Sequence, residues 1–312
     1  MTYFGAEYLV RGSARLARRL GMSPFVIGVT VVAFGTSTPE LFASVSASLK
    51  DSGDLAVGNV VGSNIANICL ILGTSALIRP MKINRLIFVR DMPIMLGISL
   101  LATVTMLDQQ ISLIEGALLI AGVVAYTWFN YWRGLKDPHV REEALAIEHE
   151  HGLRLEADVH PKVLPNVGLT LLGLACLTLG ASLLVRGGVD LARWARVPEI
   201  VIGATVVAFG TSVPELAASV QAARKRESDI AIGNVVGSNV FNLLCVLGAA
   251  SLARPIAVSD ETLYWHVPAM LIVSFLAIPI MGSGRRLGRL EGAGMVLAYL
   301  AYAVGAYLLR LS

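Results

Sequence analysis

The chain of 312 residues contains one long segment twice, at a constant offset that aligns Gly5 with Gly180. Residues 5–80 align with residues 180–255 without a gap, and 43 of these 76 aligned positions are identical. Self-similarity of this length indicates paired structural repeats, and in membrane proteins built in this way the binding site lies at the repeat interface. The two halves of the fold are therefore expected to be built alike and to share one site.

Long apolar runs fill both halves of the chain, among them residues 92–107, 113–129, 167–185 and 267–281. Roughly 20 apolar residues are needed to cross the hydrocarbon of a bilayer, so the shorter runs need flanking residues to complete a span. Only 15% of the residues are charged, against about 25% in a soluble domain. These features predict an all-α polytopic membrane protein surrounded by lipid, and they argue against a soluble helical protein.

Each repeat is predicted to contain five spans, which gives ten transmembrane helices. The spans are residues 5–20, 24–49, 55–78, 86–107 and 111–132, then 165–195, 198–224, 230–253, 263–281 and 290–309. Because five is odd, the second repeat enters the membrane from the opposite side, and the repeats are related by a two-fold axis in the membrane plane.

The spans divide the chain into a first five-helix repeat (1–133), a linker (134–164) and a second five-helix repeat (165–312). The first helix is expected to be short, because only Met1–Phe4 precede the shared segment in the first repeat, whereas Pro165–Leu179 precede it in the second.

The linker is polar and contains His139, His149, His151 and His160. A regulatory metal site is one interpretation of the Glu-His-Glu-His run at residues 148–151. We favour a solvated linker, because alternation along the chain does not make ligands converge. Of the 25 Lys and Arg residues, 18 fall in alternate connections that include the linker. The positive-inside rule then predicts a cytoplasmic linker with both termini outside.

The remaining composition excludes several kinds of protein. The three cysteines, at positions 69, 176 and 245, lie in apolar runs without a Cys-x-x-Cys pair, and we interpret them as packing residues rather than disulfide or zinc ligands. The sequence contains no stripe of basic residues with interleaved aromatics, which is the pattern that would indicate a nucleic-acid partner. The segment from Met1 to Leu20 lacks the pattern of a cleavable signal peptide.

The second and seventh spans carry the same motif, Gly-Thr-Ser-x-Pro-Glu, at residues 35–40 and 210–215. A carboxylate within a membrane span costs roughly 2.5–3.5 kcal/mol, so it marks a functional site by default. On a helix, Thr36, Ser37 and Glu40 share one face. Pro39 has no N–H for the carbonyl of Gly35, so the helix should break and release main-chain oxygens. Discontinuous helices are therefore predicted at the midplane.

The third and eighth spans carry Gly-Asn-x-x-Gly-Ser-Asn-x-x-Asn at residues 58–67 and 233–242. Ser63 and Asn67 lie four apart and offer a hydroxyl and an amide oxygen on one face. Together with the carboxylates they form an all-oxygen set, which hard cations such as Ca²⁺ prefer. Plainer interpretations stay open: a lone glutamate that is protonated and hydrogen-bonded, glycines that only allow close packing, and asparagines that only bridge helices (positions 59, 64, 234 and 239).

These four motifs, in this order, resemble those of the calcium/cation antiporter superfamily, and specifically of prokaryotic sodium/calcium exchangers. The resemblance covers the ten-span layout and nearly the whole chain. It implies exchange of Na⁺ for Ca²⁺ by alternating access, four cation sites at the midplane, and a location in the prokaryotic plasma membrane. It implies no enzymatic activity, no cofactor besides the transported ions, and no obligate protein partner.

The resemblance also implies a role for each matching residue. Glu40 and Glu215 would bind Ca²⁺ with main-chain oxygens of Thr36 and Thr211. The implied Na⁺ sites are Ala33, Ser37 and Ser63 beside Glu215, and Ala208, Thr211, Ser212 and Ser238 beside Glu40. Asn67 and Asn242 would line the centre, although members of this family often carry Asp at the second of these positions.

Two other functions are compatible with the residues. A Ca²⁺/H⁺ antiporter would use the same glutamates to release protons, and it would run on a pH gradient without Na⁺. An intramembrane hydrolase would use Ser37 or Ser212 as a nucleophile with Glu40 as base. No histidine lies in these motifs, and a duplicated, symmetric active site argues against a hydrolase.

Overall fold

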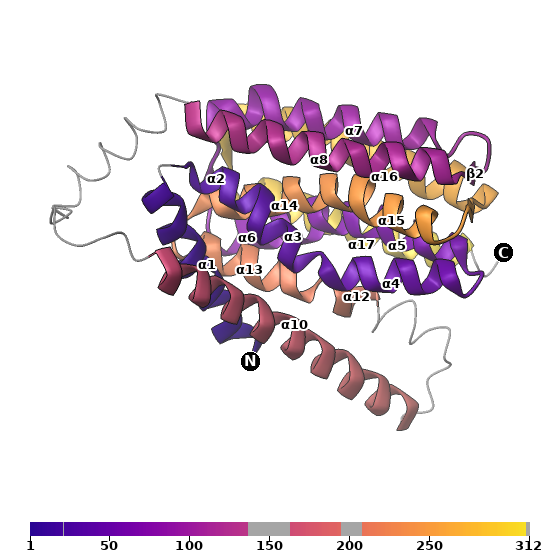
Figure 1. Ribbon diagram of the computed structural model, residues 1–312, viewed down its shortest axis with the longest axis horizontal. Helices are drawn as coiled ribbons and strands as arrows, with labels where there is room; N and C mark the ends of the chain where they lie inside the picture. The colour runs from indigo at the N-terminus through magenta and orange to yellow at the C-terminus, as the bar shows by residue number, and fades with distance from the viewer. Residues whose placement is uncertain (21, 137–162, 195–207, 310–312) are drawn as a thin grey trace, which may run out of the picture.

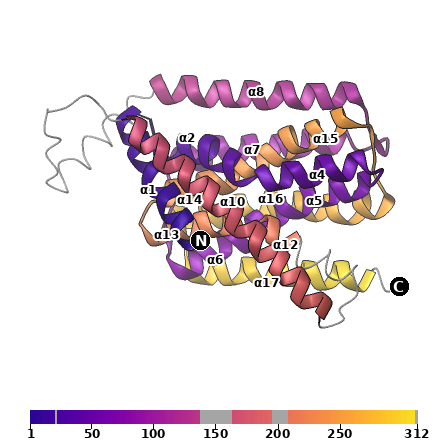
Figure 2. The same ribbon diagram turned by 60° about the horizontal axis from the view of Figure 1, so that its bottom comes forward.

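The computed structural model describes residues 1–20, 22–136, 163–194 and 208–309 as a bundle of long helices with two very short strand pairs (Figures 1 and 2). The first repeat contains α1 (Thr2–Leu20), α2 (Pro24–Ile27), η1 (Gly28–Val32), α3 (Ala33–Thr36), α4 (Thr38–Leu49), α5 (Gly53–Ala66), η2 (Asn67–Leu72), α6 (Gly73–Ile78), β1 (Met81–Lys82), η3 (Ile87–Asp91), α7 (Met92–Val104), β2 (Gln110–Ile111) and α8 (Leu113–Lys136).

The second repeat follows the same order. It contains α10 (Val163–Trp194), α12 (Ala208–Thr211), α13 (Val213–Arg224), α14 (Ser228–Phe241), η5 (Asn242–Val246), α15 (Leu247–Ala253), β3 (Ile256–Ala257), η6 (Thr262–His266), α16 (Val267–Gly282), η7 (Ser283–Arg285), β4 (Arg286–Leu287) and α17 (Arg289–Leu309). The predicted linker and its histidines fall mainly in residues 137–162, and the start of the seventh span falls in residues 195–207. Both lie outside the described residues.

Central elements of the two repeats correspond at the sequence offset. Helix α4 matches α13, and α5 matches α14, with both bounds of each pair separated by the same offset that aligns Gly5 with Gly180. The strands pair between repeats: β1 with β4, and β2 with β3, both antiparallel. Each strand of one repeat thus pairs with a strand of the other, which is the pattern expected when a two-fold axis relates the repeats.

The low burial of most apolar helices indicates a lipid environment. Six helices in the described part of the chain are long and apolar enough to cross a membrane, or seven if the bent pair α2–α4 counts as one span. The spans at residues 53–78 and 228–253 are 72% and 94% buried, whereas the other four are only 22–33% buried. Such large apolar surfaces are stable in hydrocarbon and not in water. The protein is therefore a multi-pass helical membrane protein; the number ten stays a prediction.

The two strand pairs lie at opposite ends of the bundle, because the 18-residue span at 87–104 separates β1 from β2. At the β1–β4 end, the Arg79 guanidinium donates to the carbonyl of Arg224. At the other end, Arg254 forms an ion pair with Asp51, and Gln109 donates to Asp260. The β1–β4 end is below called the basic end, and the β2–β3 end, where Asp51 and Asp260 are the acceptors, is called the acidic end.

Helices α1 and α10 pack along each other and cross the bundle obliquely (Figure 2). Their contact is close because glycines face the opposing backbone. A methyl group added to Gly173 would overlap the Leu9 nitrogen, and one on Gly12 would lie 2.8 Å from the Thr170 nitrogen.

Candidate cation site

The predicted break in the second span is present. Helices α2–α3 and α4 meet at Ser37 with a bend of 45°, and Ser37 has left the helical conformation (φ −84°, ψ 8°). The second repeat breaks in the same way at Ser212 (φ −86°, ψ 1°), between α12 and α13. Pro39 and Pro214 follow two residues later, where they remove an N–H donor from the first turn of the new helix. Each break therefore places a carboxylate in the first turn of a helix, the end that favours negative charge.

Each glutamate contacts a serine of the other repeat. The Ser37 hydroxyl donates to Glu215 Oε1 at 2.9 Å, and the Ser212 hydroxyl donates to Glu40 Oε1 at 3.3 Å. Both glutamates are 1% exposed. The two breaks therefore face each other, and the two carboxylates belong to one site shared by the repeats.

The asparagines of the third and eighth spans hold the glutamate helices in place. Asn59 Nδ2 donates to Ser44 Oγ at 2.9 Å and lies 3.4 Å from the Glu40 carbonyl oxygen. Asn234 makes the same contacts with Ser219 and the Glu215 carbonyl, at the same distances. The two serines were not recognised in the sequence. Their signal was present, because both recur four positions after the glutamates.

Thr36 and Thr211 end the short helices α3 and α12, directly before the breaks. The Thr36 hydroxyl donates to Asn234 Oδ1 at 3.1 Å. Ala33 and Ala208 begin the same two helices, and the side chain of Ala208 lies outside the described part.

Ser63 and Ser238 are buried on α5 and α14, and Asn67 and Asn242 begin the π-helical segments η2 and η5. Five π-helical segments occur among the described residues, and none was predicted from the sequence.

The predicted close approach at the Gly-x-x-x-Gly pairs occurs in the second repeat. A methyl group added to Gly237 would lie 2.6 Å from the Val29 backbone and 2.7 Å from the Ala33 side chain. Helix α14 is therefore pressed against η1 and α3. The same expectation for Gly58 and Gly62 stays a prediction, because no described atom lies within 4 Å of an added methyl group there. The segment at 198–207, which corresponds to α2 and η1, lies outside the described part.

Five buried oxygen atoms at these positions have no hydrogen-bond partner within the described part of the chain. They are Glu40 Oε2, Glu215 Oε2, Asn67 Oδ1, Asn242 Oδ1 and Ser238 Oγ. No Lys, Arg or His side chain within the described ranges forms an ion pair with either glutamate. Buried polar groups without partners are costly, and unpaired buried carboxylates are more so. Carboxylate, amide and hydroxyl oxygens of this kind are the ligands that hard cations prefer.

The plainer interpretation of a protonated carboxyl fits less well. A protonated carboxyl is a donor and needs an acceptor for its hydrogen. Neither Oε2 has one among the described residues, and each Oε1 already receives a serine hydroxyl.

The match to known proteins covers both halves of the chain. The family model described as "Sodium/calcium exchanger protein" matches residues 1–132 and 165–308. The chain belongs to the sodium/calcium exchanger family. It is 32% identical to the sodium/calcium exchanger MaX1 of Methanosarcina acetivorans, with 96% of this chain and 93% of the relative aligned. It is 35% identical to the putative antiporter CaxA of Alkalimonas amylolytica, with the same coverage.

The solved structures agree with this assignment. The sodium–calcium exchanger NCX_Mj, soaked with 10 mM Na⁺ and no Ca²⁺, superposes with a TM-score of 0.81 at 30% identity, covering 96% of this chain and 93% of that one. The predicted resemblance to prokaryotic sodium/calcium exchangers is thus confirmed, as is the prediction of a helical membrane protein.

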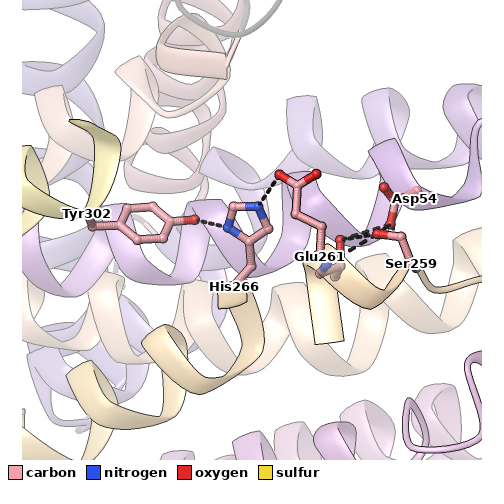
Figure 3. Close-up of polar contacts among 6 residues, drawn as sticks. Asp54, Ser259, Glu261, His266 and Tyr302 are labelled. Atoms are coloured by element: carbon pink, nitrogen blue, oxygen red, sulfur yellow. Dashed lines mark hydrogen bonds and ion pairs between the residues drawn. The ribbon is translucent and has the colours of Figure 1, made fainter. Parts of the chain in front are cut away.

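A second polar network in this exchanger-family chain lies outside the motifs (Figure 3). Asp54 Oδ1 accepts from the Ser259 hydroxyl at 2.6 Å and from Thr262 Oγ1 at 2.8 Å, which ties α5 to the start of η6. His266 Nδ1 lies 2.8 Å from the Tyr302 hydroxyl and links η6 to α17. These contacts hold α5, η6 and α17 together at the acidic end of the bundle, and none of them involves Glu40 or Glu215.

Proposed function

We propose that this protein exchanges Na⁺ for Ca²⁺ across the membrane by alternating access. The observation that supports this most is the pair of buried carboxylates, one from each repeat, which lack a basic partner among the described residues and lie among oxygens without hydrogen-bond partners there. The relatives named as sodium/calcium exchangers support the choice of the two ions.

In this proposal Ca²⁺ binds between Glu40 and Glu215, with main-chain oxygens of Thr36 and Thr211. Two carboxylates neutralise one Ca²⁺, and Ca²⁺ takes six to eight oxygens at about 2.3–2.6 Å. Main-chain oxygens are available because the helix breaks at Ser37.

Na⁺ occupies sites that share the same glutamates. One Na⁺ site uses Ala33, Ser37 and Ser63 with Glu215. Its mirror uses Ala208, Thr211, Ser212 and Ser238 with Glu40, and Asn67 and Asn242 line the centre. Because the two ions compete for one pair of carboxylates, they bind in turn. Neutralisation by either ion permits the change between inward- and outward-facing states.

The serine hydroxyls act as donors and ligands here, not as nucleophiles. Ser37 and Ser212 occupy equivalent positions, each donating to the glutamate of the other repeat, which suits a symmetric ion site better than a single reaction centre. We therefore propose a transporter without enzymatic activity or resident cofactor, and without an obligate protein partner.

The basic end of the bundle is proposed to face the cytoplasm of a prokaryotic cell. Arg79, Lys82, Arg224 and Arg286 lie at or beside the β1–β4 end. The positive-inside rule assigns that end, and with it the linker, to the cytoplasm, and the termini to the outside. Single cysteines near Asp51 and near Lys82, in a background without Cys69, Cys176 and Cys245, test this. An impermeant thiol reagent added to intact cells should label only the first.

The function is tested with purified protein in proteoliposomes. Vesicles loaded with Na⁺ and diluted into Na⁺-free medium should accumulate ⁴⁵Ca²⁺, and vesicles loaded with K⁺ should not. A pH gradient imposed without Na⁺ should drive no uptake, which separates this function from Ca²⁺/H⁺ exchange. Absence of Na⁺-driven uptake in vesicles shown to contain folded protein would overturn the proposal.

A further inference from the structure

Four buried asparagines form one hydrogen-bonded group that crosses between the repeats. Asn67 Nδ2 donates to Asn239 Oδ1 at 3.0 Å, and Asn242 Nδ2 donates to Asn64 Oδ1 at 3.1 Å. All four residues are 1% exposed. Below, Asn64 and Asn239 are called the anchor asparagines, and Asn67 and Asn242 the central asparagines.

The amides of the anchor asparagines are fixed in orientation. Asn64 Nδ2 donates to the Asn239 carbonyl oxygen at 3.2 Å and lies 3.8 Å from Met270 Sδ. Asn239 Nδ2 lies 3.6 Å from Met95 Sδ. A carbonyl oxygen and a thioether sulfur accept hydrogen bonds and never donate them, so they must face the NH₂ end of each amide. The Oδ1 end of each anchor is thereby turned toward a central asparagine.

This orientation is passed on to the central asparagines. The Oδ1 of an anchor only accepts, so Asn67 and Asn242 must present their NH₂ groups to it. The oxygen and the nitrogen of an amide point in different directions from the carbon that joins them, so the Oδ1 of each central asparagine points away from its anchor. Those two Oδ1 atoms are buried and have no partner among the described residues.

We propose that Asn64 and Asn239 are positioning residues that hold the amide oxygens of Asn242 and Asn67 toward the transported cation. Without an anchor, a central amide is free to turn its NH₂ group, which carries partial positive charge, toward the ion. Outer-shell partners of this kind change metal affinity by roughly 10–100-fold when removed. The inference rests on the proposed function, since it names how that site presents two of its ligands.

Each anchor belongs to the repeat opposite to the ligand that it orients. Asn64 of the first repeat orients Asn242 of the second, and Asn239 orients Asn67. The central ligands are thus correctly oriented only when the two repeats are docked, which makes the pair of repeats, and not either alone, the unit that binds the ion.

The test is a double-mutant cycle on Ca²⁺ binding, measured by calorimetry on the purified full-length protein. Asn64→Ala should raise the Kd for Ca²⁺ by about tenfold in the natural background. In the Asn242→Asp background it should raise the Kd less than twofold, because a carboxylate presents an oxygen in either orientation. Asn239→Ala should behave in the same way against Asn67→Asp.

Asn130→Ala is the matched control, because Asn130 is also a buried asparagine and donates to the Tyr126 carbonyl at 2.9 Å on α8. It should lower the melting temperature and leave the Kd unchanged. In proteoliposomes Asn64→Ala should raise the KM for Ca²⁺ and leave the maximal rate unchanged. Asn64→Leu, which keeps most of the volume, replaces Asn64→Ala if that variant does not fold.

An equal rise of the Kd in both backgrounds would overturn the positioning role, as would a rise of the same size in Asn130→Ala. These outcomes leave the proposed function intact as long as the natural protein binds Ca²⁺ and exchanges it for Na⁺. If the natural protein neither binds nor exchanges Ca²⁺, the proposed function itself fails, and the positioning role fails with it.

Discussion

Replacing Glu40 by glutamine should reduce exchange at least tenfold while leaving the fold intact. Glutamine keeps the volume of the side chain and one carbonyl oxygen, which still accepts from the Ser212 hydroxyl in place of Glu40 Oε1. Its NH₂ group takes the place of Oε2, which has no partner among the described residues. The substitution therefore removes one negative charge and little else.

The size of the effect follows from the charge. At an effective dielectric constant of about 20, a divalent ion about 2.4 Å from a unit negative charge is attracted by on the order of 14 kcal/mol. A tenfold loss of affinity corresponds to about 1.4 kcal/mol, so it requires only about a tenth of this attraction to remain after the ion's hydration is lost. Ten times weaker binding is thus the lower bound that we expect for Glu40→Gln.

The assay is Na⁺-driven ⁴⁵Ca²⁺ uptake at a Ca²⁺ concentration well below the natural KM, where the rate is proportional to affinity. Uptake by Glu40→Gln should fall below one-tenth of the natural rate. Glu115→Gln is the control, because Glu115 accepts from the Ser112 backbone and hydroxyl at 2.8 Å, outside the motifs, and glutamine preserves an acceptor. It should retain the natural rate. Uptake by Glu40→Gln above half of that rate would refute the reasoning.

Three further outcomes are expected in detergent solution. Ca²⁺ at 100 times its Kd should stabilise the protein against unfolding by about 2.7 kcal/mol, and an unchanged melting temperature would contradict binding to the folded state. Gly237→Ala should lower the free energy of unfolding by about 1–3 kcal/mol, because its methyl group meets the Val29 backbone at 2.6 Å. Gly97→Ala, with no described atom within 4 Å, should leave the free energy of unfolding unchanged. Equal melting temperatures of the two variants would contradict the close packing at Gly237. Lys225→Ala breaks the 3.0 Å ion pair that joins the residue after α13 to Glu7 of α1. It should lower the free energy of unfolding by at most about 1 kcal/mol, and a larger loss in thermal unfolding would contradict this estimate.

The main architecture of the site could be predicted from the sequence because duplication carries geometric information. Two similar segments at one offset imply equivalent folds, and an odd number of spans implies inversion. Pro39 and Pro214 mark the breaks, since a missing N–H has a local effect that does not depend on the rest of the fold. The facing of Glu40 and Glu215 then follows from the two-fold axis.

The finer features of the site could not be predicted because they depend on contacts between distant segments. A π-helical turn needs packing that compensates for its poorer backbone geometry, so Asn67 and Asn242 show no local signal for it. The orientation of the central amides depends on Met95 and Met270, each of which lies in the other repeat from the anchor asparagine that it contacts. Only the assembled fold brings these groups together.

The central claim is that the two repeats build one shared cation site that Ca²⁺ and Na⁺ occupy in turn. Calorimetric titration of the purified natural protein with Ca²⁺, with and without saturating Na⁺, tests it most directly. The account predicts one Ca²⁺ per chain in the absence of Na⁺ and none in its presence. Two Ca²⁺ per chain with equal affinity, or Ca²⁺ binding that saturating Na⁺ leaves unchanged, would contradict it.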